Sequence, residues 1–258
     1  MPELPEVETA VRRLRDAALG KSIARVVLLH PALKRRISAP RLRSLRGARV
    51  RAVERRGKHQ LLMFEDGRVL HTHFRMTGDW HVDRTGDDLP RFARAAVAFD
   101  DGTRVILEDP RALSTLELHA ANAPPTLLLG PEPGDRLLTA RSFYIALAKK
   151  RGPIKPVLLD QRVIAGLGNI YAAESLWHAH ITPTTRASSL TPQQVGKLLA
   201  AIRRVINRAT GARYTDPSVS RLAVYDRAGK PCRRCRTLIK RIVQAGRSTY
   251  FCPTCQTE

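Results

Sequence analysis

Apolar residues at the start of the chain follow the spacing of one helical face. An amphipathic helix is predicted over residues 4–19, and Gly20 is its expected stop. Steps of three and four residues separate its apolar positions, which are Leu4, Val7, Val11, Leu14 and Ala18. Acidic residues lie in or near the first turns, where the helix dipole favours negative charge, namely Glu3, Glu6 and Glu8.

From residue 22 to about residue 118 the pattern changes to the period of strands. Asp66-Gly67 separates HQLLMFE from RVLHTHF, and Asp101-Gly102 separates AAVAFD from TRVILE. An Asp-Gly pair between two alternating segments is a strong hairpin signal. Several such strands in succession predict a sandwich of antiparallel sheets.

Helices return after a stretch rich in proline and glycine between residues 124 and 134. Three candidate helices follow, over residues 141–150, 156–165 and 169–179. A further helix begins at Thr191-Pro192-Gln193-Gln194, which supplies a threonine cap, a proline in the first turn and a glutamine three residues after the cap. It is expected to run to Gly211. The predicted fold class is therefore α+β, with a β-sandwich first and a helical region after it.

The charge of the chain is strongly one-sided. Forty-five Lys and Arg against 23 Asp and Glu give a net charge of +22 over 258 residues. Residues 139–258 hold 21 of the basic residues and 5 of the acidic ones. Such a surface favours a polyanion, because each neutralised phosphate releases counterions, and an anionic membrane surface would also attract it. A basic face that serves only solubility is the remaining explanation, although solubility does not require this asymmetry.

All four cysteines form two pairs near the C-terminus. Cys232 and Cys235 form one Cys-x2-Cys pair, Cys252 and Cys255 form the other, and 16 residues separate the pairs. Two such pairs reach one tetrahedral Zn²⁺ ion from two turns. The intervening TLIKRIVQAGRSTYF is typical of two strands joined at Gly246, so one structural zinc in a β-hairpin finger is predicted. Two disulfides are the alternative, but no secretory pattern suggests an oxidising compartment, and no second metal-ligand spacing is visible.

Several motifs occur in a fixed order along nearly the whole chain. They are Met1-Pro2-Glu3-Leu4-Pro5-Glu6-Val7-Glu8-Thr9, Arg56-Gly57-Lys58, His73-Phe74-Arg75-Met76-Thr77-Gly78, Asp109-Pro110-Arg111 and LLDQRVIAGLGNIYAAESLW at residues 158–177, followed by the four-cysteine finger. Together they resemble the formamidopyrimidine-DNA glycosylase and endonuclease VIII family. The resemblance implies an N-terminal helix on a two-sheet β-sandwich, then a helix–two-turns–helix domain and a C-terminal β-hairpin zinc finger. It also implies that duplex DNA lies between the two halves.

By this resemblance the N-terminal amine is the nucleophile. Removal of Met1 leaves Pro2 with a secondary amine, and an α-amino group titrates near pH 8, so part of it is neutral at physiological pH. The amine attacks the anomeric carbon and expels the base, and the resulting iminium promotes elimination on both sides of the sugar. Glu3 helps to open the sugar ring, Glu6 is a second acid near the base, and Lys58 lies near the sugar and phosphate. Without the resemblance, Pro2 is simply a proline at a helix start and Lys58 a solvated cation. Glu3 and Glu6 are then acids that stabilise the helix dipole.

A base inside a duplex must be flipped out before it reaches such a nucleophile. By the resemblance, Met76 and Arg111 enter the vacated stack, and Leu113 is a further wedge. Without it, Met76 is a core candidate and Arg111 a surface cation. The residues implied to hold phosphates around the lesion are His73, Lys155, Asn169 and Arg247. For Asn169 the sequence adds a physical reason, because a helix that begins at Gly168-Asn169 favours an anion at its N-terminus.

The sequence leaves two alternatives for the damaged base, which correspond to the two branches of the family. In formamidopyrimidine enzymes a phenylalanine follows Asp-Pro-Arg by two positions, where this chain has Leu113, and residues 212–223 are fewer than the loop that caps oxidised guanine. His73-Phe74-Arg75-Met76 favours that branch nevertheless. We therefore expect a bifunctional glycosylase and abasic-site lyase for 8-oxoguanine and formamidopyrimidines, with oxidised pyrimidines as the alternative. A non-catalytic zinc protein that binds damaged DNA is the rival, and an RNA-binding zinc ribbon is disfavoured because aromatic residues are only 5% of the chain.

The motifs and the breaks between them predict a domain order. We expect a catalytic β-sandwich at residues 1–130, a linker at 131–138, the helix–two-turns–helix domain at 139–225 and the finger at 226–258. The finger carries eight basic and two acidic residues, which favours a grip on phosphate. No apolar run approaches the roughly 18 residues of a membrane span. The expected protein is bacterial and cytoplasmic, associated with the nucleoid through its substrate, and by the resemblance a monomer.

Overall fold

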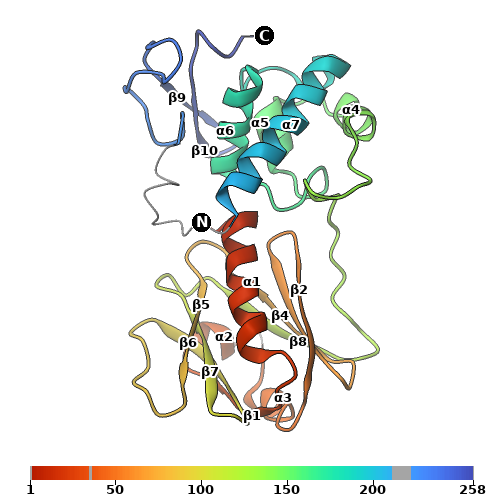
Figure 1. Cartoon of the computed structure of the whole chain (residues 1–258), viewed down its shortest axis with the longest axis vertical. Helices are drawn as coiled ribbons and strands as arrows, with labels where there is room; N and C mark the ends of the chain where they lie inside the picture. Colours follow the sequence, from red (N-terminus) through yellow and green to blue (C-terminus); the bar gives the residue numbers. More distant parts are fainter. Residues whose placement is uncertain (1, 35–36, 211–221, 258) are drawn as a thin grey trace. The chain divides into compact units, whose positions relative to one another are not determined.

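The computed structural model describes residues 2–34, 37–210 and 222–257, and it contains two compact units. The first unit comprises Met1–Pro2 and Glu6–Leu127, and the second comprises Glu3–Pro5 and Leu128–Glu258. The N-terminal helix α1 (Leu4–Ala18, labelled in Figure 1) therefore contributes its first two residues to the second unit and the rest of its length to the first.

Two four-stranded antiparallel sheets build the first unit, as predicted. In the first sheet the strand order is β1 (Ile23–Leu28), β6 (Ala93–Phe99), β7 (Thr103–Glu108) and β5 (Asp79–Arg84). In the second it is β2 (Val50–Arg56), β3 (His59–Phe64), β4 (Val69–His73) and β8 (Thr115–His119). Two short helices, α2 (Pro31–Lys34) and α3 (Ala39–Arg43), lie between β1 and β2 in the sequence.

The apolar face of α1 and the inward faces of both sheets form one hydrophobic core. Val7, Val11 and Leu14 of α1 are nearly inaccessible to solvent within it. Along β3, buried residues alternate with half-buried ones, which is the period of a strand with one face on a core. Both Asp-Gly pairs lie in hairpins, one between β3 and β4 and one between β6 and β7. Gly67 and Gly102 take the left-handed conformation there, with φ of 83° and 80°.

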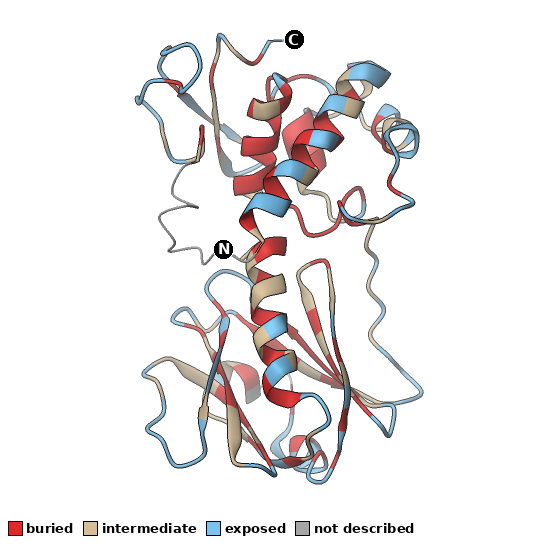
Figure 2. Ribbon diagram, in the orientation of Figure 1, coloured by how far each residue is buried: buried red, intermediate tan, exposed pale blue. Residues whose placement is uncertain are grey.

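Helices dominate the second unit. They are α4 (Ala140–Ala148), α5 (Ile154–Leu159), α6 (Asn169–Ala179), the short 3-10 helix η1 (Ala187–Ser189) and α7 (Pro192–Ala209), and the hairpin β9 (Lys240–Gln244) and β10 (Arg247–Phe251) follows. Nearly every residue of α6 is buried, whereas α7 exposes one face (Figure 2). Thr191 and Gln194 form the predicted capping box, and the predicted stop at Gly211 lies outside the described residues. Over the ranges that the structure describes, no helix is long and apolar enough to cross a membrane.

The helix predicted over residues 156–165 is wrong in its second half. Helix α5 ends at Leu159, and Asp160 leaves the helical conformation with ψ of 107°. The side chain of Asp160 accepts the Arg162 N–H, and the side chain of Gln161 accepts the Gly166 N–H. These side chains satisfy the backbone of a tight turn, as aspartate often does. The apolar residues that followed the helical period are buried in that turn.

Candidate functional site

Glu3 is fully buried at the N-terminus of α6. One carboxylate oxygen accepts the N–H groups of Gly168 at 2.8 Å and Tyr171 at 3.3 Å, and the other accepts the Ile170 N–H at 2.8 Å. A helix leaves the N–H groups of its first turn unsatisfied, and its dipole favours an anion there. The anion expected at this helix start is thus the carboxylate of Glu3. The half-buried Pro2 is attached directly to this anchored residue.

Two glycines make room for this arrangement. A Cβ at Gly168 would lie 2.3 Å from the Glu3 carboxyl carbon, and one at Gly166 would lie 2.4 Å from a methyl carbon of Leu4. Gly166 also has φ of 89°, and its carbonyl accepts the Leu4 N–H at 3.0 Å. Any side chain at either position would displace residues 3 and 4, so the Gly-Leu-Gly segment forms the seat of the N-terminus.

Lys58 occupies a two-residue turn between β2 and β3 in the first unit. Gly57 takes φ of 58°, which fits the hairpin turn that needs glycine at its first central position. Arg55 donates to the Gly57 carbonyl at 3.1 Å and forms an ion pair with Glu8 of α1 at 2.8 Å. Burial raises the pKa of Glu8, but the hydrogen bonds from its two arginine partners outweigh burial and lower it overall. This pair fixes the Lys58 turn against α1, which also carries the half-buried Glu6.

A second buried carboxylate, Asp109, joins two loops of the first unit. It accepts hydrogen bonds from the Thr77 hydroxyl, from the backbone N–H of Arg111 at 3.1 Å and from that of Leu113 at 2.7 Å. The N–H and hydroxyl of Ser114 complete its shell at 2.7 and 2.8 Å. Burial raises the pKa of Asp109, but these hydrogen bonds lower it overall. The sequence analysis did not predict this role, because it depends on a contact with Thr77, 32 positions earlier in the chain.

The two loops that Asp109 joins carry the predicted wedge residues. Met76 is 37% exposed and Leu113 is 44% exposed, and Arg111 is exposed between a proline and an alanine. Arg75 and Ala112 take left-handed conformations with φ of 58° and 52°. Non-glycine residues persist in that region only where neighbouring contacts hold them. The Arg75 N–H donates to His73 Nδ1, and the N–H groups on both sides of Ala112 donate to Asp109. The loops therefore present apolar tips on a fixed backbone.

His73 is half-buried at the end of β4. Its Nδ1 accepts the Arg75 N–H at 3.0 Å, so the proton of the neutral ring resides on Nε2. Burial, followed by the nearby His59 and Arg75, lowers the pKa of His73 to about 3. The ring is therefore a neutral donor at physiological pH.

Lys155 and Asn169 lie together in the second unit. Lys155 is 1% exposed, and its ammonium group donates to Asn169 Oδ1 at 2.6 Å, the Ser248 carbonyl at 2.9 Å and the Thr249 hydroxyl at 2.7 Å. Asn169 Nδ2 also donates to the Ser248 carbonyl at 3.0 Å. Burial, and then the charge of Arg247, lower the pKa of Lys155 to about 8. The two side chains join α5, α6 and β10, and Arg247 is exposed at the start of β10.

A third buried carboxylate, Glu174 of α6, holds the segment that precedes the finger. Its oxygens accept the N–H groups of Ala223 at 2.7 Å and of Val224 and Tyr225 at 2.9 Å. Burial raises the pKa of Glu174. Helix α6 thus supplies N–H donors to one carboxylate at its start and a carboxylate acceptor further along.

The four cysteines converge on one point of the finger. Sγ of Cys232 lies 3.9 Å from Sγ of Cys255, and Sγ of Cys235 lies 3.5 Å from Sγ of Cys252. Zinc bonds to thiolates of about 2.3 Å place sulfurs about 3.8 Å apart in a tetrahedron, whereas a disulfide needs about 2.05 Å. The donor set and its spacing therefore fit one structural Zn²⁺ and exclude the two disulfides.

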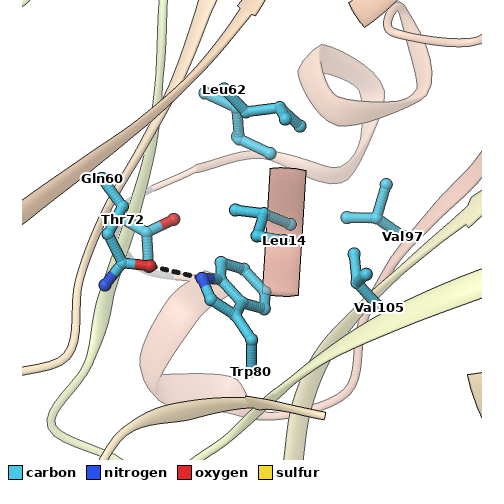
Figure 3. Close-up of a pocket in the computed structure, with 8 residues that line it drawn as sticks. Leu14, Gln60, Leu62, Thr72, Trp80, Val97 and Val105 are labelled. Atoms are coloured by element: carbon cyan, nitrogen blue, oxygen red, sulfur yellow. Dashed lines mark hydrogen bonds between the residues drawn. The ribbon is translucent and has the colours of Figure 1, made fainter. Parts of the chain in front are cut away.

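The cavity in the sandwich core is too small for a base (Figure 3). It measures about 10 Å³, near the threshold for a single water molecule, and its lining includes Leu14, Leu62 and Val97. The indole N–H of Trp80 donates to Gln60 Oε1 at its edge. This cavity is a packing defect between the sheets.

Comparisons with known proteins agree on one family. Its models for the formamidopyrimidine-DNA glycosylase N-terminal domain and H2TH domain match residues 1–116 and 129–218, and a model for the zinc finger found in FPG and IleRS matches residues 229–257. The formamidopyrimidine-DNA glycosylase of Chloroflexus aurantiacus is 40% identical over 271 residues, which cover 99% of this chain and 98% of that protein. The one of Thermus thermophilus is 38% identical over 276 residues, covering 100% and 99%.

Solved structures match over the same length. MutM in complex with carbocyclic 8-oxo-G containing DNA has a TM-score of 0.89 and 29% identity, and the match covers all of both chains. Lactococcus lactis FPG (MutM) with a FAPY-dG containing DNA has a TM-score of 0.90 and 30% identity, covering 99% of this chain and 100% of that one.

We predict that Asp109→Asn loosens both wedge loops. An amide accepts fewer and weaker hydrogen bonds than a carboxylate, so the free energy of unfolding should fall by about 2–4 kcal/mol at pH 7. Because folding lowers the pKa of Asp109, the loss should shrink as the pH falls below about 4 and the wild-type group is protonated. Urea unfolding at several pH values, with the exposed Asp88→Asn as control, measures this. A loss that does not vary with pH contradicts the assignment to the charge.

We predict that Cys252→Ser removes the finger's zinc. Three thiolates cannot complete the tetrahedral shell, so elemental analysis after a wash with a mild chelator should fall from one zinc per chain to near zero. Thr254→Ser, a conservative change in the same finger, should keep its zinc. An unchanged zinc content in the Cys252 variant would show that these cysteines do not hold the ion.

Proposed function

The chain belongs to the formamidopyrimidine-DNA glycosylase family, and we propose from this membership that Pro2 is the nucleophile of a bifunctional enzyme. The protein is a DNA glycosylase of base excision repair that acts on duplex DNA. Its substrates are oxidised bases and abasic sites. The observation that carries the proposal for Pro2 is the anchoring of Glu3 by three N–H groups at the start of α6, because Glu3 is the residue to which the terminal amino acid is attached.

The proposed reaction has two stages. The lone pair of the neutral Pro2 nitrogen forms a bond to C1′ of the damaged nucleotide, the bond from C1′ to the base breaks, and the base leaves with a proton. The sugar ring then opens to give an iminium, which withdraws electrons from C2′. Loss of a C2′ proton expels the 3′ phosphate, and a second elimination expels the 5′ phosphate. Hydrolysis of the iminium returns the free amine.

We propose different tasks for the three charged residues of this site. Glu3 is first a positioning residue, since both of its oxygens accept N–H groups of α6, and it helps to open the sugar ring from that fixed place. Glu6, one turn into α1, transfers protons near the base. Lys58 lies on a turn held by Arg55, and its ammonium stabilises the phosphate next to the lesion.

The wedge and phosphate contacts are proposed on the same basis. Met76, Leu113 and Arg111 fill the gap that the flipped nucleotide leaves, and their support comes from the rigid loops around Asp109. His73 donates through Nε2, because Nδ1 is occupied by the backbone.

Near the finger, we propose that one basic residue contacts the DNA phosphate directly and another supports that contact indirectly. Arg247 is exposed on the finger hairpin and contacts phosphate directly. Lys155 acts through Asn169 and β10, which it holds with all three of its ammonium protons.

We propose a lesion class, a division into domains and a location for this protein. The motif around His73 favours 8-oxoguanine and formamidopyrimidines, and Leu113 in place of an aromatic residue is the feature that would extend the range to oxidised pyrimidines. The proposed domains are catalysis at residues 1–130, a linker at 131–138, DNA binding at 139–225 and the finger at 226–258. We propose that the protein acts as a monomer in the cytoplasm, on the nucleoid; its bacterial relatives support the cytoplasmic location.

Borohydride trapping tests the nucleophile. The untagged protein is incubated with labelled duplexes that contain 8-oxoguanine, a formamidopyrimidine, an oxidised pyrimidine or an abasic site. We expect a covalent protein–DNA band, because borohydride reduces the iminium. A residue added before Pro2 should abolish the band, and Pro2→Ala, which keeps a primary amine, should reduce incision by at least tenfold.

A C-terminal tag is the matched control, since it leaves the amine free and should not change the band. Full activity of the N-terminally extended protein contradicts the proposal for Pro2. Absence of any band, with binding to the damaged duplex retained, supports the non-catalytic alternative. The ranking of the four substrates identifies the lesion class.

The salt dependence of DNA binding tests the division between Arg247 and Lys155. Arg247→Ala should reduce the slope of log K against log salt by about 0.9, the effect of one lost phosphate contact. Lys155→Ala should change the slope less but lower the free energy of unfolding by about 2 kcal/mol, because Asn169 and Thr249 lose a buried charged partner. The exposed Lys197→Ala is the control. A full slope change in the Lys155 variant, without destabilisation, contradicts its indirect role.

A further inference from the structure

A row of histidine side chains and one glutamate crosses the outward face of the sheet that contains β3, β4 and β8. His59 of β3 pairs with His73 at the end of β4. His71 lies two residues before His73 on β4 and pairs with Glu117 of β8. His119 follows Glu117 by two positions. Residues two apart on a strand share a face, so His59, His71, Glu117 and His119 all point to the side opposite the apolar core.

Three of these side chains have the separation of a metal site. One donor atom from each of His71, Glu117 and His119 lies within 4.8 Å of the others. Ligand bonds of about 2.1 Å place donor atoms about 3.4 Å apart around a tetrahedral ion, so small side-chain rotations would close the triangle. Two imidazoles and one carboxylate favour zinc or another borderline transition metal over Mg²⁺ or Ca²⁺, which take oxygen ligands.

The hydrogen bonds of His71 prepare it as a ligand. The residue is only 9% exposed, and its Nε2 lies 2.8 Å from Nδ1 of His59. With the proton on Nε2, His71 donates to His59 and keeps a lone pair on Nδ1. That Nδ1 atom is buried and has no hydrogen-bond partner among the described residues. A ring oriented through one nitrogen, with the other left as a lone pair, is the usual arrangement of a metal-binding histidine.

His119 shows a second unsatisfied nitrogen at the same place. Its Nε2 is buried without a hydrogen bond to the part of the chain that the structure describes, and it lies 3.8 Å from Glu117 Oε2. The side chains of His119 and Glu117 are 25% and 37% exposed, so an ion has access from solvent. Buried polar atoms without partners are rare in native proteins, and two of them meet at this cluster.

We propose that His71, Glu117 and His119 bind one divalent transition-metal ion, with Zn²⁺ as the physiological candidate. A water molecule is the expected fourth ligand. The ion would cross-link β4 to β8 in the first unit, far in sequence from the four-cysteine finger. This site is independent of the proposed function of the chain.

Calorimetric titration with Zn²⁺ tests the site. The protein keeps its finger zinc, and a mild chelator is first dialysed away. We expect one further Zn²⁺ to bind per chain. His119→Ala and Glu117→Gln should each weaken this binding by at least tenfold while the tightly held finger zinc stays at one per chain. His81→Ala, an exposed histidine on β5 of the other sheet, is the matched control and should bind like the wild type.

Cobalt distinguishes this site from the finger. Co²⁺ bound to imidazole and carboxylate gives visible bands without the intense thiolate charge-transfer absorption of a four-cysteine site. We expect the wild type to gain only the former spectrum and His119→Ala to lose it, with unchanged thermal unfolding before metal is added. No additional Zn²⁺, equal binding by wild type and His119→Ala, or a thiolate spectrum would each overturn the proposal.

Discussion

A buried carboxylate must find hydrogen-bond donors, and for Glu3 those donors are the free N–H groups at the start of α6. An unpaired charge in a protein interior costs several kcal/mol, so N–H groups that offset that cost set the position of residue 3. The surrounding backbone is arranged around this pairing. Gly166 and Gly168 lack side chains because the N-terminal segment occupies the space where their Cβ atoms would lie. Pro2 is attached directly to the anchored Glu3, which supports the proposal that its amine acts from a defined position.

The same arrangement recurs at two other carboxylates. Asp109 collects N–H groups from a loop that bears exposed wedge residues, and Glu174 collects those of residues 223–225. In the Asp109 loop the residues proposed to touch DNA have exposed tips, so their own packing cannot hold the backbone in place. A buried acceptor with several donors does so instead, and it leaves the tips free. Rigid loops with exposed apolar ends result.

Local signals in the sequence were sufficient for much of the fold. The helical period after Leu4, the two Asp-Gly hairpins, the Thr191 cap and the cysteine pairs each depend on residues close in the sequence, and the structure confirms them. The predicted end of this helix, at residue 165, was wrong because buried apolar residues in the turn after Leu159 have the spacing of a helical face. The burial of Lys155 and the convergence of His71 on Glu117 depend on contacts between distant segments. The spacing of residues along the chain does not predict such contacts.

The separation between Glu3 and its donors has a consequence for biosynthesis. Gly168 is 165 residues further along the chain, so the ribosome adds it some 10 to 30 seconds later at about 5–20 residues per second. Throughout that interval the N–H groups that bind the Glu3 carboxylate are absent, even if strands of the sandwich have already paired. Enzymes that process N-termini therefore meet an accessible substrate before α6 emerges. A nascent chain that stalls or is cleaved before α6 lacks the N–H groups that hold Glu3.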